Sequence, residues 1–497
     1  MEELISRLKR SGVTIRVIEN NLKLQLPQGF ADQRIIDEVR THKEELITYI
    51  QTVLLSEPGL ASEETSSDNI RIPPQAEYPA TERQHSEWEY TLNTKNYSGN
   101  ISCSFIFDTL DYEILKQSVL ALMKQHEGLR TTFSYSGNTL TQVIHDHHKF
   151  KLPIALIDFS SEMPDADALS ENYESFVSAR LDLCTGPPFK VVVAKMRDRQ
   201  YVLVLVIAHI IADDLSLEIL KKDFIHCYEN FSKGRAPQLP VLDFQMKEFA
   251  LWEKTFNASK TGSQNLAYWK RELVAGIGEL PIIKSGTEDN AAIHQFFLDA
   301  GRLHKIKSKY DNESLFFIAC LYLWLYVTFQ QSQFVLGMPF LCRDREKLEG
   351  VVGYLISGIY LKVSIKENDT FSTLFDTVVQ QYTQALSHRY YARRALDFNA
   401  DPYCVAYYNN VTHIRKDEMF DVRNLKTTGA AHTPFYPVRF DISHFTNGWL
   451  VSCHYRRSVL DKELDFSAID QFMQIVDKTL EAPDSPLHVS WSAVRKR

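Results

Sequence analysis

Alternating apolar and polar positions predict a β-hairpin near the start of the chain. Residues 13–17 and 22–26 each alternate in this way, which is typical of half-buried strands. Glu19-Asn20-Asn21 lies between the two segments and supplies turn-forming residues. Apolar residues recur at helical spacing before and after the hairpin, so we expect residues 1–55 to form a small α+β unit.

Residues 56–75 lack any such pattern. They contain Ser56-Glu-Pro-Gly59, a run of acidic residues and serines, and the pair Pro73-Pro74. A segment of this composition cannot bury much apolar surface, so we interpret it as a linker. The sequence therefore predicts a domain boundary between residues 55 and 76.

From residue 76 onward, strand-like and helix-like patterns alternate. The predicted strands are 102–107, 189–195, 202–207 and 334–338, and the predicted helices are 110–125, 215–231, 314–329 and 371–386. Alternation of this kind is typical of an α/β protein with a layered sheet. The polar, loop-like stretch 257–264 separates two halves of similar size, so we divide the larger domain into lobes 76–260 and 261–497.

Length, charge and cysteine usage exclude several classes of protein. A chain of 497 residues is too long for one ordinary core, and its net charge of −8 without a basic patch argues against nucleic-acid binding. The apolar run 315–329 is too short to span a bilayer, and the N-terminus has no signal pattern. Seven cysteines without a C-x-x-C pair indicate reduced thiols. We expect a cytoplasmic protein that does not bind membranes.

One histidine stands out as a candidate for catalysis. His209 follows the apolar run 201–207, and Asp213 comes four residues later at the start of a helical pattern. An imidazole at the mouth of a buried strand is where an acyl-transfer enzyme would place a base. The alternative is a hydrogen-bonded structural histidine at a strand end.

Other chemistry is disfavoured. The tract 145–148 reads His-Asp-His-His, but adjacent ligands rarely match the spacing of a built metal site, so we expect no metal. Ser216 lacks a Gly-x-Ser-x-Gly elbow, which disfavours a serine hydrolase. We find no Gly-rich phosphate loop, so nucleotide chemistry is not supported.

The segment 208–214, Ala-His-Ile-Ile-Ala-Asp-Asp, resembles the His-His-x-x-x-Asp-Gly signature of nonribosomal peptide synthetase condensation domains. It departs from the signature twice: Ala208 replaces the first histidine and Asp214 replaces the glycine. Further segments resemble other motifs of that family in the same order along the chain. They are 81–88, 124–133, 181–188, 249–252, 337–345 and 352–356.

The resemblance implies a fold and a set of roles. We expect two lobes similar to chloramphenicol acetyltransferase, arranged in a V around a central tunnel, with His209 midway as the catalytic group. In the family the signature aspartate pairs with an arginine and shapes the loop, so Asp213 is expected to pair with Arg343 or Arg345. Asp214 lies where a helix begins and is predicted to be its N-cap, or to add a charge near the substrate channel.

Residues 1–55 resemble the N-terminal docking domains of the tubulysin-synthetase type. The resemblance implies that this unit binds the C-terminal tail of the preceding synthetase by strand addition. The edge strand would be Leu22, Lys23, Leu24, Gln25 and Leu26, and the charges of Lys23 and Arg16 would favour an acidic tail. A folded cap that binds nothing is the alternative.

No adenylation or carrier segment follows before Arg497, as in the stand-alone terminal enzymes of rhabdopeptide-like assembly lines. The resemblance thus implies transfer of a peptidyl thioester from a carrier protein to a free amine, with chain release. The enzyme would need no cofactor of its own, because phosphopantetheine arrives on the carrier. Two alternatives remain: an ester-forming acyltransferase, or an inactive recruitment module in which Ala208 marks chemistry lost naturally or by engineering.

Overall fold

The computed structural model describes thirteen segments of the chain. They are residues 14–18, 21–25, 38–43, 77–93, 99–160, 175–196, 200–274, 291–310, 312–396, 406–415, 438–445, 447–456 and 464–487. The chain divides into two compact units, Met1–Asn69 and Ile70–Arg497. Each unit is described by itself.

The first unit contains the predicted hairpin. Strands β1 (Thr14–Ile18) and β2 (Asn21–Gln25) pair antiparallel, with Thr14 opposite Gln25. This pairing confirms the hairpin. Residues 38–43 are helical, while the remainder of the two predicted helices and Leu26 lie outside the described residues.

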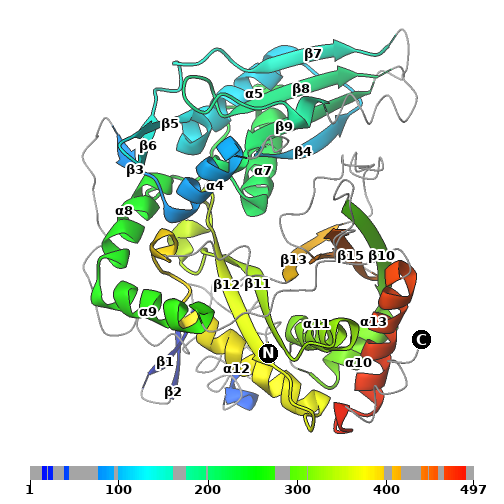
Figure 1. Ribbon diagram of the computed structural model, residues 1–497. Coiled ribbons are helices and arrows are strands. Elements are labelled where there is room, and N and C mark those ends of the chain that lie inside the picture. Colours follow the sequence, from blue (N-terminus) through cyan, green and yellow to red (C-terminus); the bar gives the residue numbers. More distant parts are fainter. Residues whose placement is uncertain are drawn as a thin grey trace. The chain divides into compact units, whose positions relative to one another are not determined.

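The first lobe of the larger unit is built on a four-stranded sheet in the order β4-β9-β8-β7 (Figure 1). The strands are β4 (Asn100–Phe107), β7 (Ile154–Asp158), β8 (Phe189–Lys195) and β9 (Tyr201–Ala208). Helices α5 (Tyr112–Gln125) and α7 (Asp214–Ser232) pack against each other and against this sheet. Leu203, Leu205 and Ile207 alternate along β9 and bury their side chains in the shared core. Val204 and Val206 on the other face are buried in a second apolar cluster, so burial of both faces explains the continuous apolar run.

A smaller sheet and a helix complete this lobe. The sheet has the order β3-β6-β5, formed by β3 (Tyr78–Pro79), β5 (Thr131–Ser136) and β6 (Thr139–Ile144). Helix α4 (Glu82–Asn93) contacts the turn that follows β9. The side chains of Trp88 on α4 and Phe133 on β5 are both buried in the core of this lobe.

The second lobe contains a six-stranded sheet in the order β10-β15-β14-β13-β11-β12. Its strands are β10 (Ala291–Asp299), β11 (Gln333–Leu341), β12 (Ile356–Ser364), β13 (Ala406–Arg415), β14 (Val438–Phe445) and β15 (Gly448–Arg456). Its helices are α10 (Ala300–Lys307), α11 (Glu313–Phe329), α12 (Phe371–Ser387) and α13 (Leu464–Glu481). These helices and the sheet form the largest core among the described residues.

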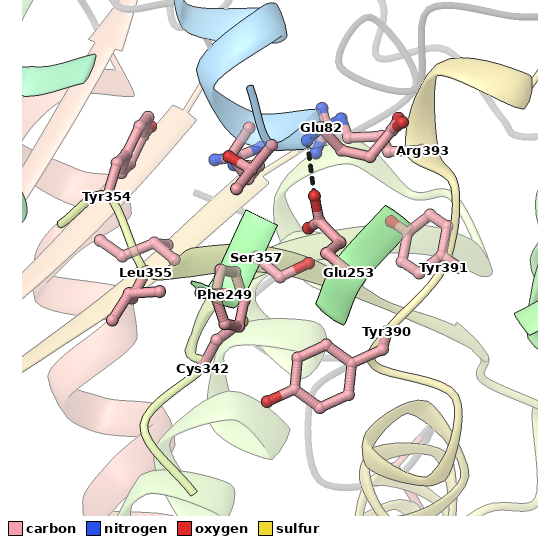
Figure 2. Close-up of a pocket in the computed structure, with 13 residues that line it drawn as sticks. Glu82, Phe249, Glu253, Cys342, Tyr354, Leu355, Ser357, Tyr390, Tyr391 and Arg393 are labelled. Carbon is pink, nitrogen blue, oxygen red and sulfur yellow. Dashed lines mark hydrogen bonds between the residues drawn. The ribbon is translucent and has the colours of Figure 1, made fainter. Parts of the chain in front are cut away.

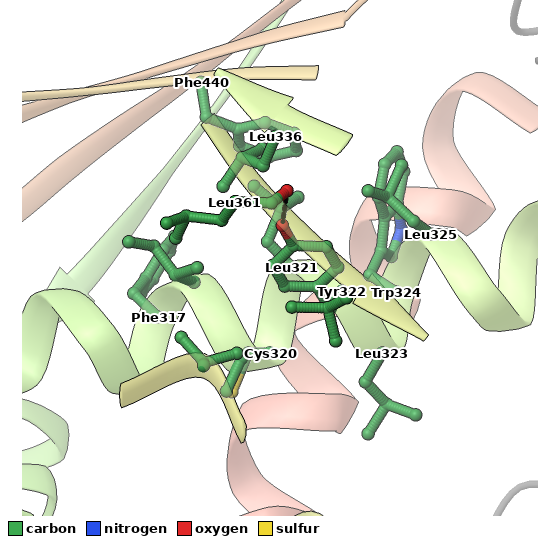
Figure 3. Packing of buried hydrophobic residues seen from close by; sticks show 14 of the residues in the cluster. Phe317, Cys320, Leu321, Tyr322, Leu323, Trp324, Leu325, Leu336, Leu361 and Phe440 are labelled. Carbon is green, nitrogen blue, oxygen red and sulfur yellow. Dashed lines mark hydrogen bonds between the residues drawn. The ribbon is translucent and has the colours of Figure 1, made fainter. Parts of the chain in front are cut away.

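Helix α11 runs through the centre of that core (Figure 3). A helix that is apolar on all sides is typically buried, and the side chains of Phe317, Tyr322 and Trp324 are fully buried here. The Tyr322 hydroxyl donates a hydrogen bond to the Leu361 carbonyl at 2.6 Å, so its polar atom has a partner. Among the described helices, none combines the length and the apolar character needed to cross a bilayer.

Helices α8 (Met246–Asn257) and α9 (Lys260–Val274) connect the two lobes. At the entry to α8, the Gln245 side chain donates to the Gln125 carbonyl of the first lobe. On α9, the Trp269 indole donates to the His388 carbonyl of the second lobe at 2.7 Å. The chain therefore passes from one lobe to the other along these two helices.

Candidate functional site

Strand β9 delivers His209 to the end of the first sheet. The chain leaves β9 at Ala208 and forms the short helix η4 (His209–Ile211), while the His209 backbone N–H donates to the Gly99 carbonyl at 2.6 Å. The imidazole Nδ1 lies 2.7 Å from the Ala212 carbonyl oxygen. Because a carbonyl oxygen only accepts, Nδ1 carries a hydrogen, and in the neutral ring the lone pair is therefore on Nε2. The half-buried imidazole is thus arranged to act as a base through Nε2.

Tyr354 of the second lobe covers this imidazole. Its ring centroid lies 4.4 Å from that of His209, at an interplanar angle of 34°. Burial raises the pKa of Tyr354 to about 12, so the phenol stays neutral. The sequence did not predict this contact, although Tyr354 belongs to segment 352–356, which matched a family motif.

Asp213 accepts four hydrogen bonds, and two of them come from the second lobe. Its Oδ1 accepts from the Ser216 backbone N–H (2.8 Å), the Ser216 hydroxyl (2.7 Å) and Arg343 Nη2 (2.8 Å). Its Oδ2 accepts from the Leu355 backbone N–H at 3.1 Å. The aspartate is fully buried, so its charge depends on these partners.

Of the two candidate arginines, Arg343 pairs with Asp213. Its side chain is 6% exposed, and its Nη1 donates to the carbonyls of Leu348 (2.8 Å) and Val351 (2.6 Å). Arg345 instead lies over the Trp252 ring, with 4.1 Å from its guanidinium carbon to the ring centroid. Arg345 therefore stabilises the packing on α8 and does not contact Asp213.

The prediction that Asp214 is the N-cap of α7 is wrong. The cap is Asp213, whose extended backbone and side-chain bond to the Ser216 N–H are those of a capping residue. Asp214 is the first helical residue and its side chain is exposed.

Ala208 lies in the core of the first lobe. It is 2% exposed, pairs with Asn100 across the sheet and belongs to the apolar cluster shared by α5 and α7. A side chain at this position contributes to packing at the end of β9.

Tyr354 also borders a small pocket that is partly open to solvent (Figure 2). Arg83 of α4 lies over the Tyr354 ring, with 5.6 Å from its guanidinium carbon to the centroid. On the opposite wall, Glu253 Oε2 accepts the Glu82 backbone N–H at 2.8 Å. Burial raises the pKa of Glu253 to about 8, although the hydrogen bond from Glu82 acts in the lowering direction.

A further group of possible metal ligands lies on a turn after β6. The ligand atoms of Asp146, His147 and His148 all come within 4.8 Å of one another. All three residues are at least partly exposed, and the His148 backbone N–H donates to Asp146 Oδ1 within the turn. The absence of a metal stays a prediction.

In the first unit, strand β2 includes four of the five residues assigned to docking. Leu22, Lys23, Leu24 and Gln25 pair with β1, while Leu26 lies outside the described residues. Within the described part of this unit, β2 has β1 on one edge and no strand on the other.

Comparison with known proteins identifies two regions of the chain. Residues 74–493 match the family model of the condensation domain, and residues 1–52 match that of the TubC N-terminal docking domain. The two matched regions correspond to the two compact units.

Relatives with similar sequences include very large synthetases. A linear gramicidin synthase of Brevibacillus parabrevis is 29% identical over 293 residues, which are 56% of this chain and 6% of that protein. Surfactin synthase subunit 1 of Bacillus subtilis is 28% identical over 297 residues, or 57% of this chain and 8% of that protein. The chain thus covers less than a tenth of each of these two proteins.

Solved structures share the fold at low sequence identity. The X-domain from teicoplanin biosynthesis has a TM-score of 0.71 and 18% identity, and the match covers 84% of this chain and 98% of that one. The structure described as the basis for condensation domain-mediated chain release from the enacyloxin polyketide synthase has a TM-score of 0.66 and 16% identity, covering 97% and 95%. The chain belongs to the condensation-domain family and carries an N-terminal docking domain of the TubC type.

Proposed function

We propose that this chain forms an amide bond by transferring a peptidyl thioester from a carrier protein to an amine, in the cytoplasm. The observation that carries the proposal is the hydrogen bond between His209 Nδ1 and the Ala212 carbonyl. The Nδ1–H is fixed on this carbonyl, so Nε2 is left with a lone pair for the attacking amine. The condensation-domain match over residues 74–493 supports the same chemistry.

The reaction follows from this arrangement. A neutral amine attacks the thioester carbonyl, the C–N bond forms, and the proton on nitrogen passes to His209 Nε2. The C–S bond then breaks, and the thiolate of the phosphopantetheine arm takes the proton from the imidazolium. Alignment of the two reactants contributes roughly 7–11 kcal/mol to reactions of this type. General base catalysis adds about 10²–10⁴-fold.

Asp213 and Arg343 are assigned a structural role in this proposal. Both side chains are buried. They form an ion pair with each other, and each also forms hydrogen bonds with backbone groups. Arg345 and Asp214 lie outside this network, since Arg345 stacks on Trp252 and Asp214 is exposed.

The replacement of the first signature histidine by Ala208 is compatible with activity. Ala208 is buried in the apolar core at the end of β9. His209 alone is therefore assigned to the chemistry.

We further infer that the acceptor is a free amine and that the reaction releases the chain. The enacyloxin neighbour is described as mediating chain release, and the match to it covers 97% of this chain. The upstream partner would be a synthetase whose C-terminal tail adds as a strand to β2, along Leu22–Leu26. The docking-domain match over residues 1–52 supports this partner.

The test is an assay of product formation by mass spectrometry. The protein is mixed with a peptidyl thioester on a carrier protein and with panels of amines and alcohols. We expect amide from the wild-type chain and from Ala208→His, and loss of product in His209→Ala by about 10²-fold or more. His226→Ala removes an exposed histidine on α7 and is the matched control.

Other outcomes would separate the alternatives. Ester in place of amide would identify an ester-forming enzyme. Product from Ala208→His alone would mean that the wild-type chain is disabled. No product from either protein, with the carrier bound, would favour a recruitment module.

A further inference from the structure

We propose that Tyr354 is a positioning residue for His209, and that Asp213 and Ser216 influence the reaction by fixing Tyr354. The proposal rests on the proposed function, since it assigns a role in the same site. Tyr354 belongs to the second lobe, whereas His209, the proposed base, belongs to the first.

The contact between the two rings is the first step. The hydrogen bond from Nδ1 to Ala212 fixes one atom of the imidazole but leaves the ring free to tilt about it. A neutral aromatic ring at 4.4 Å and 34° restricts that tilt by packing against one imidazole face. Tyr354 itself is only 7% exposed, so its ring is held by its surroundings.

The backbone on both sides of Tyr354 is bound by the first turn of α7. The Gly353 N–H donates to Ser216 Oγ at 3.1 Å, and the Leu355 N–H donates to Asp213 Oδ2 at 3.1 Å. Ser216 Oγ also lies 3.0 Å from the Gly353 carbonyl. The chain segment that presents Tyr354 is therefore attached to the same loop that carries His209.

Glycine at 353 fits the close approach of this segment to α8. A Cβ atom built there would collide with the side chain of Met246 at the start of α8. The segment thus fits closely between α7 and α8, with Tyr354 directed toward His209.

Arg83 holds the Tyr354 side chain from α4. Its guanidinium carbon lies 5.6 Å from the ring centroid. His209, Tyr354 and Arg83 form a connected set drawn from both lobes. A change in how the lobes meet would alter the support of the imidazole.

The experiment compares four single variants and one double variant, Ser216→Ala/Tyr354→Leu. Tyr354→Leu removes the ring, Tyr354→Phe keeps the ring without the hydroxyl, and Ser216→Ala removes the bonds to Gly353. Ser232→Ala, at the exposed end of the same helix, is the matched control. The readouts are kcat and KM with the carrier-bound thioester, and ¹⁵N NMR of histidine-labelled protein, with the His209 signals assigned from the spectrum of His209→Ala.

We expect Tyr354→Leu to lower kcat by about 10- to 100-fold, the size of effect that a misplaced catalytic group produces, with little change in KM. The His209 ¹⁵N signals should shift in the same variant. Tyr354→Phe should stay within about twofold of wild type, because the ring is kept. Ser216→Ala should lower kcat, and the Ser216→Ala/Tyr354→Leu double variant should lose no more than Tyr354→Leu, as expected for residues acting through one contact.

Unchanged kcat and unchanged His209 signals in Tyr354→Leu would overturn the proposal, as would additive losses in the double variant. If Tyr354→Leu does not fold, Tyr354→Met and Ser216→Ala are compared with wild type by the same two measurements. The NMR readout does not depend on turnover. If the wild-type protein has no condensation activity but Tyr354→Leu still shifts the His209 signals, the proposed function is rejected. The contact between Tyr354 and His209 is then still supported.

Discussion

Two neighbouring arginines show how much position decides the role of a charged residue. Arg343 is buried against Asp213, while Arg345 lies over the Trp252 ring. Both occur in the same loop after β11, so the sequence offered them as equal partners. Only the path of the chain, which turns one guanidinium inward, distinguishes them.

This difference gives a prediction at the scale of single residues. Arg343→Met leaves the Asp213 carboxylate buried without its cation and should lower the free energy of unfolding by about 3–5 kcal/mol. Arg345→Met keeps an apolar contact with Trp252 and should cost about 0.5–1 kcal/mol. Urea denaturation followed by tryptophan fluorescence measures both. Equal losses in the two variants would contradict the assigned pairing.

At this scale the sequence predicted a contact where a motif marked the residue, and missed one whose partner is distant in the chain. The signature predicted that Asp213 pairs with one of two arginines, and Arg343 confirms that pairing. The catalytic role of His209 stays a prediction. The contact of Tyr354 with His209 was not predicted, because nothing in the local segment indicates which imidazole this ring covers. The N-cap was placed one residue late because two aspartates occur in succession, and only backbone conformation identifies the one that caps.

At the scale of elements, the contact between α4 and α8 surrounds the carboxyl group of Glu253. Glu253 of α8 accepts the backbone N–H of Glu82, the first residue of α4. Glu82 in turn accepts the Arg394 backbone N–H of the second lobe at 2.9 Å. The start of α4 is thus bound by both α8 and the second lobe.

The raised pKa of Glu253 predicts a pH-dependent stability. The carboxyl ionises near 4.5 in the unfolded chain and near 8 in the folded protein. Between these values the folded protein keeps a proton that the unfolded chain has lost. Stability therefore falls as the pH rises through this window and levels off above pH 8.

Glu253→Gln tests this expectation, because glutamine is neutral and its carbonyl still accepts the Glu82 N–H. The variant should melt close to wild type at pH 5 and about 1–3 °C higher at pH 9, measured by calorimetry. Glu218→Gln, an exposed site on α7, is the control. A melting difference that does not depend on pH would refute the assignment.

Whole elements were predicted best where burial is complete. The apolar runs of β9 and α11 indicated their type and nearly their ends. Strand β14 was not predicted, although Val438, Phe440 and Ile442 alternate with polar residues in the pattern that marked the N-terminal hairpin. Its place in the sheet could not be predicted, because that place depends on partner strands that are distant in sequence.

At the scale of the whole molecule, the chain combines a condensation domain with a docking domain. If the docking domain recruits the upstream synthetase, its contribution is a higher local concentration of the carrier-bound donor. It should not affect the chemical step, because His209 and its partners all lie in the other unit.

Deletion of residues 1–55 should therefore raise KM for the donor carried on the intact upstream synthetase by about 10²-fold while kcat is unchanged. KM for a small soluble peptidyl thioester should not change. Lys23→Glu in the full chain should produce a weaker effect of the same kind if the bound tail is acidic. Equal KM changes for both donors would show that the deletion damages the condensation domain itself.

The network around Asp213 has a consequence for how mutational scans of this protein are interpreted. Asp213, Ser216 and Arg343 fix the segment that presents Tyr354, so substitutions at any of them should reduce product formation. A screen scored by product alone would rank these positions beside His209 as if they shared its chemistry. A second score for abundance of folded protein separates them, since replacing His209 should remove turnover while the amount of folded protein stays near that of wild type.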